Sequence, residues 1–230
     1  MKIGAIVICR YNSSRLPGKI LKKINGKPIL TYIIERLKCV QNLDDFIVAT
    51  SINTTDQPIV DYCIKNQIKY FRGSLENVAE RFLHAGLKFH YDYAIRVNGD
   101  NLFLDHKLIS EMISVLDLNH YDLVSNVKDR TFPKGISVEI VNINFYKKLF
   151  NEFNHSKYQE HVTNYMYEYP DCGNFYHFIN HTLPHAAGAQ LAIDTENDFT
   201  FASKILNSFK KDHTGLLYTS PSPRDLLKSR

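Results

Sequence analysis

Hydrophobic positions in the first hundred residues alternate between short apolar runs and helically spaced sets. The run at 3–9 is continuously apolar, which is typical of a strand buried on both faces, and the polar, glycine-containing loop 10–19 follows it directly. After Gly26, Pro28 suits the first turn of a helix whose apolar residues recur at helical spacing to about Val40. The same pattern predicts strands at 46–50, 68–71 and 93–97 and helices at 58–66 and 76–90. Such alternation indicates an α/β fold with a mostly parallel sheet flanked by helices.

The second half of the chain continues this alternation less regularly. It predicts helices at 106–118, 144–153 and 157–169 and strands at 122–126, 136–141 and 190–193. No internal repeat or low-complexity segment interrupts it, so we expect a single domain over residues 1–214. The last stretch, 215–230, is rich in serine, proline and charge and has no apolar periodicity. We expect it to lie outside the fold, either as non-native sequence that resembles translated adapter read-through or as a natural disordered tail.

Composition narrows the class of protein. With 230 residues, of which 44% are hydrophobic, the chain is long enough to bury the core of one α/β domain. The formal net charge of +4 is spread along the sequence, which gives little reason to expect a nucleic-acid partner. The four cysteines stand far apart, so we expect reduced thiols and neither a zinc site nor a disulfide framework. No stretch approaches the roughly 20 apolar residues of a membrane span, and the first run is too short for a signal peptide, so we expect a cytoplasmic protein without a membrane partner.

The loop CRYNSSRLPGK, residues 9–19, carries the most informative chemistry. It places Arg10, Arg15 and Lys19, with the hydroxyls of two serines, directly after a buried strand. Ligands bind at the carboxyl ends of the strands in an open α/β sheet, and guanidinium groups suit phosphate through bidentate hydrogen bonds. The loop is neither a Walker loop nor a dinucleotide-binding GxGxxG, which disfavours an ATPase or a dehydrogenase. We therefore expect a triphosphate site, with a solvated basic loop as the alternative.

An acidic residue follows the strand predicted at 93–97. Asp100 lies in the turn NGD just past that strand, at the same edge of the sheet as the cationic loop. Mg²⁺ prefers one or two carboxylates together with phosphate oxygens and water. Asp100 is therefore a candidate magnesium ligand, and the alternative is an aspartate that only forms the turn after Gly99.

Several strings in the sequence resemble one enzyme family. RxxxSRLPGK, from Arg10, is followed by GKPxLxxxxxRL, from Gly26. Further strings occur in the family's order: VATS (48–51), RGSLENVAERF (72–82), RVNGDNLFLD (96–105), TFPKGISVEI (131–140), EHVTNYMYEYP (160–170) and AIDTENDF (192–199). Together they span about residues 1–210 and resemble the cytidylyltransferase superfamily that activates acidic sugars, which includes the acylneuraminate and Kdo cytidylyltransferases. The nearest resemblance is to its spore-coat polysaccharide, SpsF-type branch.

This resemblance implies a nucleotidyltransferase with a Rossmann-like, nucleotide-diphospho-sugar transferase-like fold. It implies transfer of CMP from CTP to an acidic sugar, with release of pyrophosphate, for cell-surface or spore-coat polysaccharide synthesis. It also implies Mg²⁺ as the cofactor, with Asp194 as a second carboxylate ligand beside Asp100, whereas spacing alone also allows Asp194 to be a helix N-cap. A homodimer is implied as well, with the segment 130–170 reaching towards the partner subunit and the sugar.

The matching motifs assign roles to individual residues. Arg15 and Lys19 would hold the β and γ phosphates and Arg10 would approach the transferring phosphoryl group, so these three are the expected catalytic residues. The resemblance places further residues at the nucleotide: Ser14, Gly73, Ser74, Asn77, Arg81 and Gly99. It places Glu139, Glu160 and His161 on the sugar side. Spacing alone instead reads Glu76, Glu80 and Arg81 as a solvated helix face, and His161 as a packed or solvated helical residue.

Three departures from the family's pattern leave the acceptor open. Leu102 stands where proline is usual in GDxPL, Ser137 replaces the aspartate of GLDVE, and Gln159 replaces an arginine before EHVT. The motifs do not specify the base, so a nucleotidyltransferase that uses another nucleotide and sugar is an alternative. A nucleotide-sugar-dependent glycosyltransferase would normally carry an Asp-x-Asp motif, which this sequence lacks. A non-catalytic relative would have lost a phosphate-binding cation or a metal carboxylate, and this chain keeps them.

Overall fold

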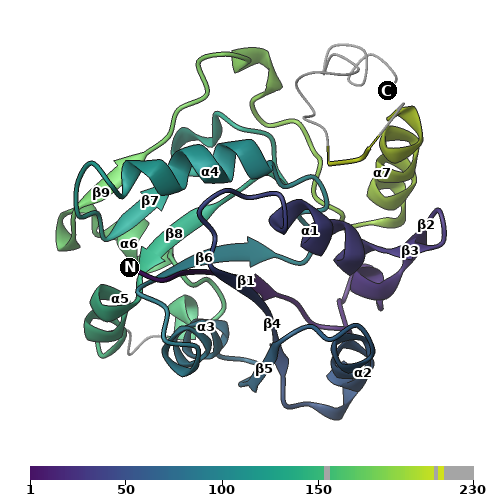
Figure 1. The fold of residues 1–230 in the computed structure, drawn as a ribbon, viewed down its shortest axis with the longest axis horizontal. Coiled ribbons are helices and arrows are strands. Elements are labelled where there is room, and N and C mark those ends of the chain that lie inside the picture. Colours follow the sequence, from purple (N-terminus) through teal and green to yellow (C-terminus); the bar gives the residue numbers. More distant parts are fainter. Residues whose placement is uncertain (153–155, 210–211, 215–230) are drawn as a thin grey trace.

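A seven-stranded sheet organises the part of the chain that the computed structural model describes, which is residues 1–152, 156–209 and 212–214. The strands lie in the order β5-β4-β1-β6-β8-β7-β9 (Figure 1). Their bounds are β1 (Ile3–Ile8), β4 (Asp45–Ser51), β5 (Tyr70–Gly73), β6 (Tyr93–Asn98), β7 (Leu123–Ser125), β8 (Glu139–Asn142) and β9 (Phe175–His177). Separately, β2 (Lys23–Ile24) and β3 (Lys27–Pro28) pair as a short antiparallel hairpin.

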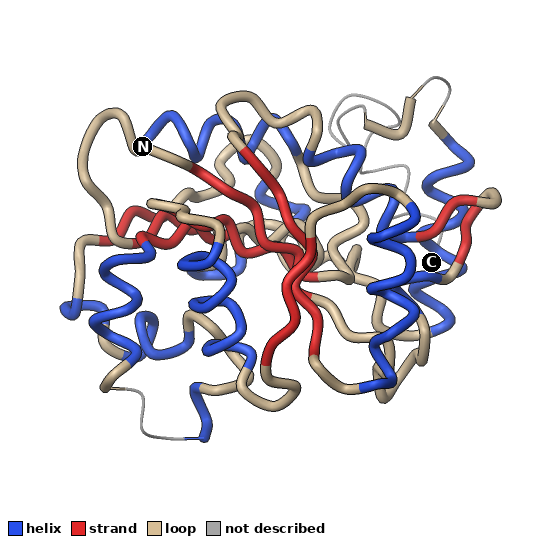
Figure 2. The backbone as a smooth tube through the Cα atoms, turned by 60° about the horizontal axis from the view of Figure 1, so that its bottom comes forward, coloured by secondary structure: helices blue, strands red, loops and turns tan. Residues whose placement is uncertain are grey.

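The sheet is mixed, with a parallel half that carries the amino-terminal strands. β1 pairs in parallel with β4 and β6, and β4 pairs in parallel with β5. β8 runs antiparallel to both β6 and β7, and β9 is parallel to β7. Figure 2 shows the strands as one twisted layer with helices on either side. The predicted mostly parallel sheet with flanking helices is therefore confirmed.

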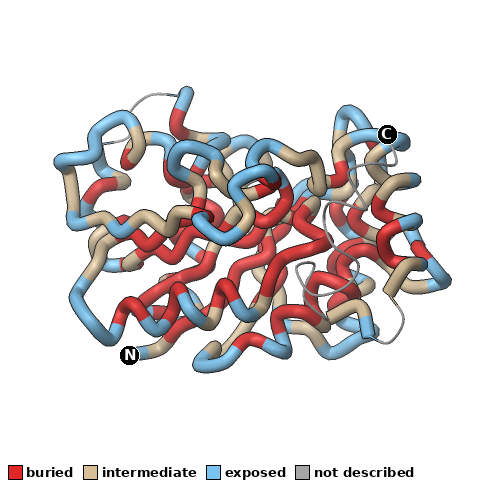
Figure 3. Tube along the Cα trace, turned by 90° about the horizontal axis from the view of Figure 1, so that it is seen from above, coloured by how far each residue is buried: buried red, intermediate tan, exposed pale blue. Residues whose placement is uncertain are grey.

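Helices cover both faces of this sheet. They are α1 (Ile29–Leu37), α2 (Gln57–Lys65), α3 (Val78–Lys88), α4 (His106–Val115), α5 (Ile143–Phe150), α6 (Asn164–Glu168) and α7 (Glu196–Ser208). Apolar residues of α1, α2, α4 and α7 share one core cluster with Ile3, Ala5 and Val7, whereas those of α3, α5 and α6 share a second cluster with Ile6. Successive side chains of β1 thus enter opposite layers, as expected of a strand buried on both faces, and Figure 3 shows the buried centre of the sheet. None of the described helices combines the length and the apolar character needed to cross a membrane.

The single helix predicted at 157–169 is wrong. A short 3-10 turn at Ser156–Tyr158 is followed by non-helical residues, and α6 begins only at Asn164. Tertiary hydrogen bonds explain the break, because the Tyr146 hydroxyl donates to the carbonyl of Val162 (2.7 Å) and the backbone N–H of Ala79 donates to that of Gln159 (2.9 Å). His161 therefore lies in a loop and not in a helix.

Other predictions differ at element ends. β5 begins two residues later than predicted, because Ile68 N–H bonds to the carbonyl of Cys63 and closes the end of α2. β8 begins at Glu139 instead of 136, after a left-handed turn at Gly135 (φ 94°). Residues 190–193 form no strand, and Gln190 makes only an isolated bridge to Lys134. The strand β9 was not predicted, and the helix α7 was implied only by the alternative in which Asp194 caps a helix. The tail expected at 215–230 lies outside the described residues.

Candidate active site

A crevice opens where β1 and β6 end, at the carboxyl edge of the parallel half of the sheet. Its volume is about 300 Å³. The residues that line it are Ile8, Cys9, Arg10, Ser13, Ser14, Arg15, Lys19, Ile20, Val78, Arg81, Arg96, Asn98, Gly99, Asp100, Glu160, His161 and Asp194. Most of the residues singled out in the sequence therefore meet in one place, although they come from widely separated segments. Four of them, Gly73, Ser74, Asn77 and Glu139, are not part of the lining.

The cationic loop after β1 is closed on itself by its own backbone. Gly18 N–H donates to the carbonyl of Tyr11 at 2.8 Å, which ties the end of the loop to its beginning. Gly18 adopts a left-handed conformation (φ 69°), which glycine tolerates without a steric penalty. The 3-10 turn Lys19–Leu21 starts directly after it. This turn brings Lys19 to the crevice, with its side chain only 14% exposed.

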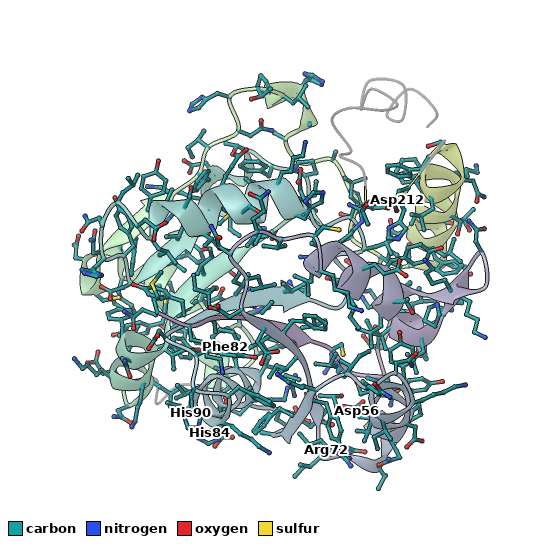
Figure 4. All side chains as sticks on the ribbon, in the orientation of Figure 1. Asp56, Arg72, Phe82, His84, His90 and Asp212 are labelled. Atoms are coloured by element: carbon teal, nitrogen blue, oxygen red, sulfur yellow. The ribbon has the colours of Figure 1, made fainter. Side chains whose placement is uncertain are left out.

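Asp56, which precedes α2, holds the cationic loop through hydrogen bonds of its carboxylate. One carboxylate oxygen accepts the backbone N–H of Tyr11 (2.7 Å), and the other accepts the Thr50 hydroxyl (2.9 Å) and both N–H (2.9 Å) and hydroxyl (2.5 Å) of Ser51. Burial acts to raise the pKa of Asp56, but these hydrogen bonds outweigh it and lower that pKa below its usual value. Figure 4 shows Asp56 near Arg72, whose guanidinium donates to the carbonyls of residues 51–53. Sequence reasoning missed Asp56, and its only signal was its place just after the VATS string.

The two candidate metal ligands face the same ammonium group. Lys19 Nζ lies 3.4 Å from Asp100 Oδ2 and 3.3 Å from Asp194 Oδ1, and it donates to the carbonyl of Ile193 at 2.7 Å. The Arg15 guanidinium also pairs with Asp194, at 2.8 Å. The backbone joins the two segments as well, because Ile193 N–H donates to the carbonyl of Asp100 (3.2 Å). The structure thus brings Asp100 and Asp194 together across a gap of 94 positions in the chain.

The interpretation of Asp194 as a helix N-cap is wrong, because Thr195 caps α7. The Thr195 hydroxyl accepts the N–H of Asp198, and the Asp198 carboxylate accepts the backbone N–H and hydroxyl of Thr195, which makes a capping box. The same Asp198 oxygen accepts the backbone N–H of Asp194 at 3.2 Å. Asp198 therefore positions Asp194 and leaves the carboxylate of Asp194 free to face the crevice.

Arg81 is a buried cation and not part of a solvated helix face. It is 2% exposed, and its guanidinium donates to the carbonyl of Ser74 at 2.5 Å. Asn77 caps α3 by accepting the N–H of Glu80 (2.9 Å), and a Cβ at Gly73 would lie 2.9 Å from Cγ of Arg81. Burial lowers the pKa of Arg81. The loop 73–77 therefore supports Arg81, and it is Arg81 that lines the crevice.

Gly99 sits where two chain segments approach closely. Its N–H donates to the carbonyl of Ile8 (2.9 Å), and a Cβ at this position would lie only 2.7 Å from Cβ of Cys9. A larger residue would push the end of β6 away from the end of β1. Glycine at 99 therefore keeps the carboxylate of Asp100 next to the cationic loop.

Glu139, expected on the sugar side, lies beneath the crevice wall. It is 2% exposed and forms an ion pair with Arg96, while its other oxygen accepts the hydroxyls of Thr163 (2.6 Å) and Tyr167 (2.7 Å). Burial acts to raise the pKa of Glu139, but the charge of Arg96 and these hydrogen bonds lower it, so the carboxyl stays ionised. Sequence reasoning missed Arg96, although an arginine inside the otherwise apolar strand 93–97 was a usable signal.

The other two sugar-side candidates do line the crevice. Glu160 and His161 are exposed loop residues between the 3-10 turn at Ser156–Tyr158 and α6. Because the hydroxyl of Thr163 bonds to Glu139, this loop is tied to the strand that carries Arg96.

The chemistry of Asp100 and Asp194 suits a hard cation such as Mg²⁺. Both offer carboxylate oxygens at the rim of a cationic crevice, with side chains 26% and 22% exposed. Among the described residues no group of three or more His, Cys, Asp or Glu side chains is arranged so that it could hold a metal ion by itself. Mg²⁺ typically uses one or two carboxylates and takes its remaining ligands from phosphate and water, so the pair fits it.

The chain matches known sequences over nearly its whole length. A family model described as cytidylyltransferase matches residues 4–218. An uncharacterized protein of Methanocaldococcus jannaschii is 33% identical over 209 residues, covering 91% of this chain and 85% of that protein. The spore coat polysaccharide biosynthesis protein SpsF of Bacillus subtilis is 32% identical over 203 residues, covering 84% and 82%. An 8-amino-3,8-dideoxy-manno-octulosonate cytidylyltransferase of Shewanella pealeana is 33% identical over 128 residues, covering 51% and 48%.

Solved structures show the same fold. A cytidylyltransferase from Leptospira borgpetersenii superposes with a TM-score of 0.88 at 26% identity, covering 99% of this chain and 93% of that one. The synthetase for CMP-2-keto-3-deoxy-manno-octonic acid, in complex with CTP, superposes with a TM-score of 0.68 at 14% identity, covering 90% and 99%. The nucleotide-diphospho-sugar transferase-like fold expected from the motifs is therefore confirmed.

Proposed function

The chain belongs to the cytidylyltransferase family, and from this premise we propose that it transfers CMP from CTP to an acidic sugar, with release of pyrophosphate. One observation carries the proposal: a single crevice at the strand ends collects the cations Arg10, Arg15 and Lys19 with the carboxylates Asp100 and Asp194. Cations suit the phosphates of CTP, and paired carboxylates suit the ion that accompanies it.

Catalysis by these residues consists of positioning and charge neutralisation. Arg15 and Lys19 hold the β and γ phosphates, which become the leaving group, and Arg10 approaches the α phosphate. The anomeric hydroxyl of the sugar attacks the α-phosphorus and releases its proton, while the bond from that phosphorus to the pyrophosphate oxygen breaks. No covalent enzyme intermediate is needed. Asp56 stabilises the conformation of the cationic loop by accepting a hydrogen bond from the backbone N–H of Tyr11.

Asp100 and Asp194 are the residues that would hold Mg²⁺. When bound, the ion supplies positive charge that offsets the charge of the phosphate oxygens. Lys19 lies between the two carboxylates, so we expect its ammonium group to turn towards phosphate when CTP and the ion bind.

The names of the relatives support an acidic acceptor and a role in polysaccharide synthesis. The relative from Shewanella acts on an octulosonate, and the relative from Bacillus belongs to spore coat polysaccharide biosynthesis. Glu160 and His161, from the loop before α6, face this acceptor. We also propose that the enzyme is a cytoplasmic homodimer, with the segment 130–170 near the partner subunit. A monomer by light scattering would contradict the dimer.

Pyrophosphate release by the full chain tests the proposal. The assay would combine Mg²⁺, each of the four nucleoside triphosphates in turn, and a panel of sugar acids that includes 3-deoxy-manno-octulosonate and N-acetylneuraminate. We expect release with CTP and one acid, abolished in Asp100→Ala and unchanged in the matched control Asp117→Ala, whose side chain is exposed beyond α4. Preference for another nucleotide would refute the assignment to cytidine, and absence of CTP binding would refute the role of the cationic loop.

A further inference from the structure

Arg96 is a cation in the crevice wall that has no role in the phosphate binding proposed above. It lies on β6, the strand between β1, which leads into the cationic loop, and β8, which begins with Glu139. Its side chain is 17% exposed, and it lines the crevice together with Glu160 and His161. Arg96 is therefore set one strand away from the loop that carries Arg10, Arg15 and Lys19.

The fold holds this guanidinium in place through contacts within the protein. Nη1 of Arg96 pairs with Glu139, which is 2% exposed and is fixed in turn by the hydroxyls of Thr163 and Tyr167. Tyr167 also shares a hydrogen bond of 2.6 Å with the hydroxyl of Ser125. Burial acts to lower the pKa of Arg96, but the charge of Glu139 raises it, so the side chain stays cationic. A charge that is immobilised in this way loses little entropy when it binds an anion.

One edge of the Arg96 guanidinium has no partner within the described part of the chain. Glu139 uses only Nη1, Nε is buried without a hydrogen bond, and Nη2 makes none. A buried N–H without a partner is destabilising, so native proteins rarely leave one unmatched unless a ligand or water supplies the acceptor. Nε and Nη2 lie side by side on the guanidinium plane, in the arrangement that donates one hydrogen bond to each oxygen of a carboxylate.

We propose that Arg96 binds the carboxylate of the acceptor sugar and thereby selects acids over neutral sugars. This inference rests on the proposed function, since it names the residue that reads the acid group of that acceptor. The placement agrees with the rest of the crevice. The loop that carries Glu160 and His161 continues into Thr163, which bonds to the same Glu139 that holds Arg96. Glu160 and His161, on the acceptor side, thus form one connected wall with Arg96, away from the cationic loop.

Substituting Arg96 and varying the ligand together test this inference. Arg96→Lys keeps a positive charge beside Glu139 but removes the bidentate edge. Acids and their carboxamides, made from 3-deoxy-manno-octulosonate and N-acetylneuraminate, are the paired probes, with the carboxamide as the matched control. We expect the wild-type enzyme to prefer the acid, and Arg96→Lys to reduce this preference about 10- to 100-fold while the KM for CTP stays within about twofold. A merely structural role for Arg96 would raise both KM values and leave the preference unchanged.

A second variant tests the inference even if Arg96→Lys does not fold. Arg96→Met combined with Glu139→Gln removes both charges of the buried pair, so no uncompensated carboxylate remains. We expect the same loss of preference for the acid, with a thermal melt that shows a folded protein. Full retention of the preference in either folded variant would overturn the inference, as would a wild-type enzyme that binds CTP but does not distinguish acid from carboxamide in turnover or binding. A wild-type enzyme that fails to bind CTP in a titration without acceptor would instead refute the proposed function.

Discussion

The carboxylates around the cationic loop divide into two kinds by their surroundings. Asp100 faces the crevice, where its partner is the ammonium group of Lys19. Asp56 is fully buried, and both of its oxygens accept hydrogen bonds, one of them from the backbone of the loop itself. Asp56 therefore determines the shape of the loop, and its loss should affect stability and nucleotide binding together.

Asp56→Asn should lower the free energy of unfolding at pH 7 by about 1–3 kcal/mol, because the amide nitrogen would face an N–H or hydroxyl donor. The hydrogen bonds depress the folded-state pKa of Asp56, so its stabilisation is present above the ordinary aspartate pKa of about 3.9 and is lost as the pH falls through the lower folded value. The gap in stability between wild type and Asp56→Asn should therefore narrow below about pH 4. Urea unfolding across a pH series would measure it, with Asp117→Asn as the exposed control. A gap that stays constant would contradict the role assigned to this carboxylate.

Gly99→Ala should reduce both activity and stability, the latter by about 1–3 kcal/mol, because the added methyl would overlap Cβ of Cys9. Combining it with Cys9→Gly removes the overlapping atom and should recover part of the loss. The free energies of unfolding of the two single variants and the double variant form a cycle that measures this coupling. Strict additivity of the two changes would show that the close approach of β1 and β6 at Gly99 is unimportant.

Some site residues could be predicted from the sequence, and others could not. Arg10, Lys19 and Asp100 could be predicted because each lies in a loop that follows a buried strand, where ligands of α/β proteins bind. Asp56 and Arg96 act through contacts with residues 45 and 43 positions away, which no local spacing indicates. Glu139 lay within a recognisable motif, but its motif did not show whether it would face the crevice or lie beneath Arg96.

At the scale of elements, the start of α7 determines where Asp194 lies. Thr195→Ala should remove the N-cap hydrogen bond and lower the free energy of unfolding by about 1 kcal/mol. It should also weaken CTP binding, because Asp198 would lose a partner that helps it to hold the backbone of Asp194. Isothermal titration and thermal melts would separate the two effects. Asn197→Ala, an exposed neighbour within the same helix turn, is the control and should change neither quantity.

Elements with a strong local pattern were predictable, and those shaped by distant contacts were not. β1, β4 and β6 were found from their apolar runs, and α1 and α3 from their helical spacing. The segment 157–169 has helix-compatible spacing, but its carbonyls at 159 and 162 accept hydrogen bonds from α3 and α5, which prevent one continuous helix. β9 is only three residues long and half-exposed, so its pattern was too short to detect.

For the whole molecule, ligand binding and global stability are coupled, because the crevice takes residues from both ends of the described chain. The lining extends from Ile8 to Asp194 and includes residues of both core layers. A ligand held by such a site stabilises the domain as a unit and not one loop alone.

CTP with Mg²⁺ should raise the melting temperature of the protein by about 5–10 °C at a concentration of about 100 Kd, since that concentration adds about 2.7 kcal/mol to the stability of a domain of this size. ATP at the same concentration should raise it much less. Differential scanning fluorimetry measures both shifts, and Arg15→Ala should reduce the CTP shift. Equal shifts with CTP and ATP would indicate that the crevice does not select the base.

The position of Lys19 between two carboxylates also leads to a prediction about competition between common anions and CTP. Asp100 and Asp194 neutralise the charge of the Lys19 ammonium group. Inorganic phosphate brings no cation that could replace Lys19 at those carboxylates. Phosphate that displaced the carboxylates from Lys19 would leave them without a partner, so we expect it to bind weakly. A nucleotide that binds together with a divalent ion provides a new partner for both sides of this contact. The ion replaces Lys19 at the two carboxylates, and the phosphates replace the carboxylates at Lys19. Added phosphate should therefore leave the apparent KM for CTP almost unchanged in steady-state assays, and the enzyme would keep working in a phosphate-rich environment.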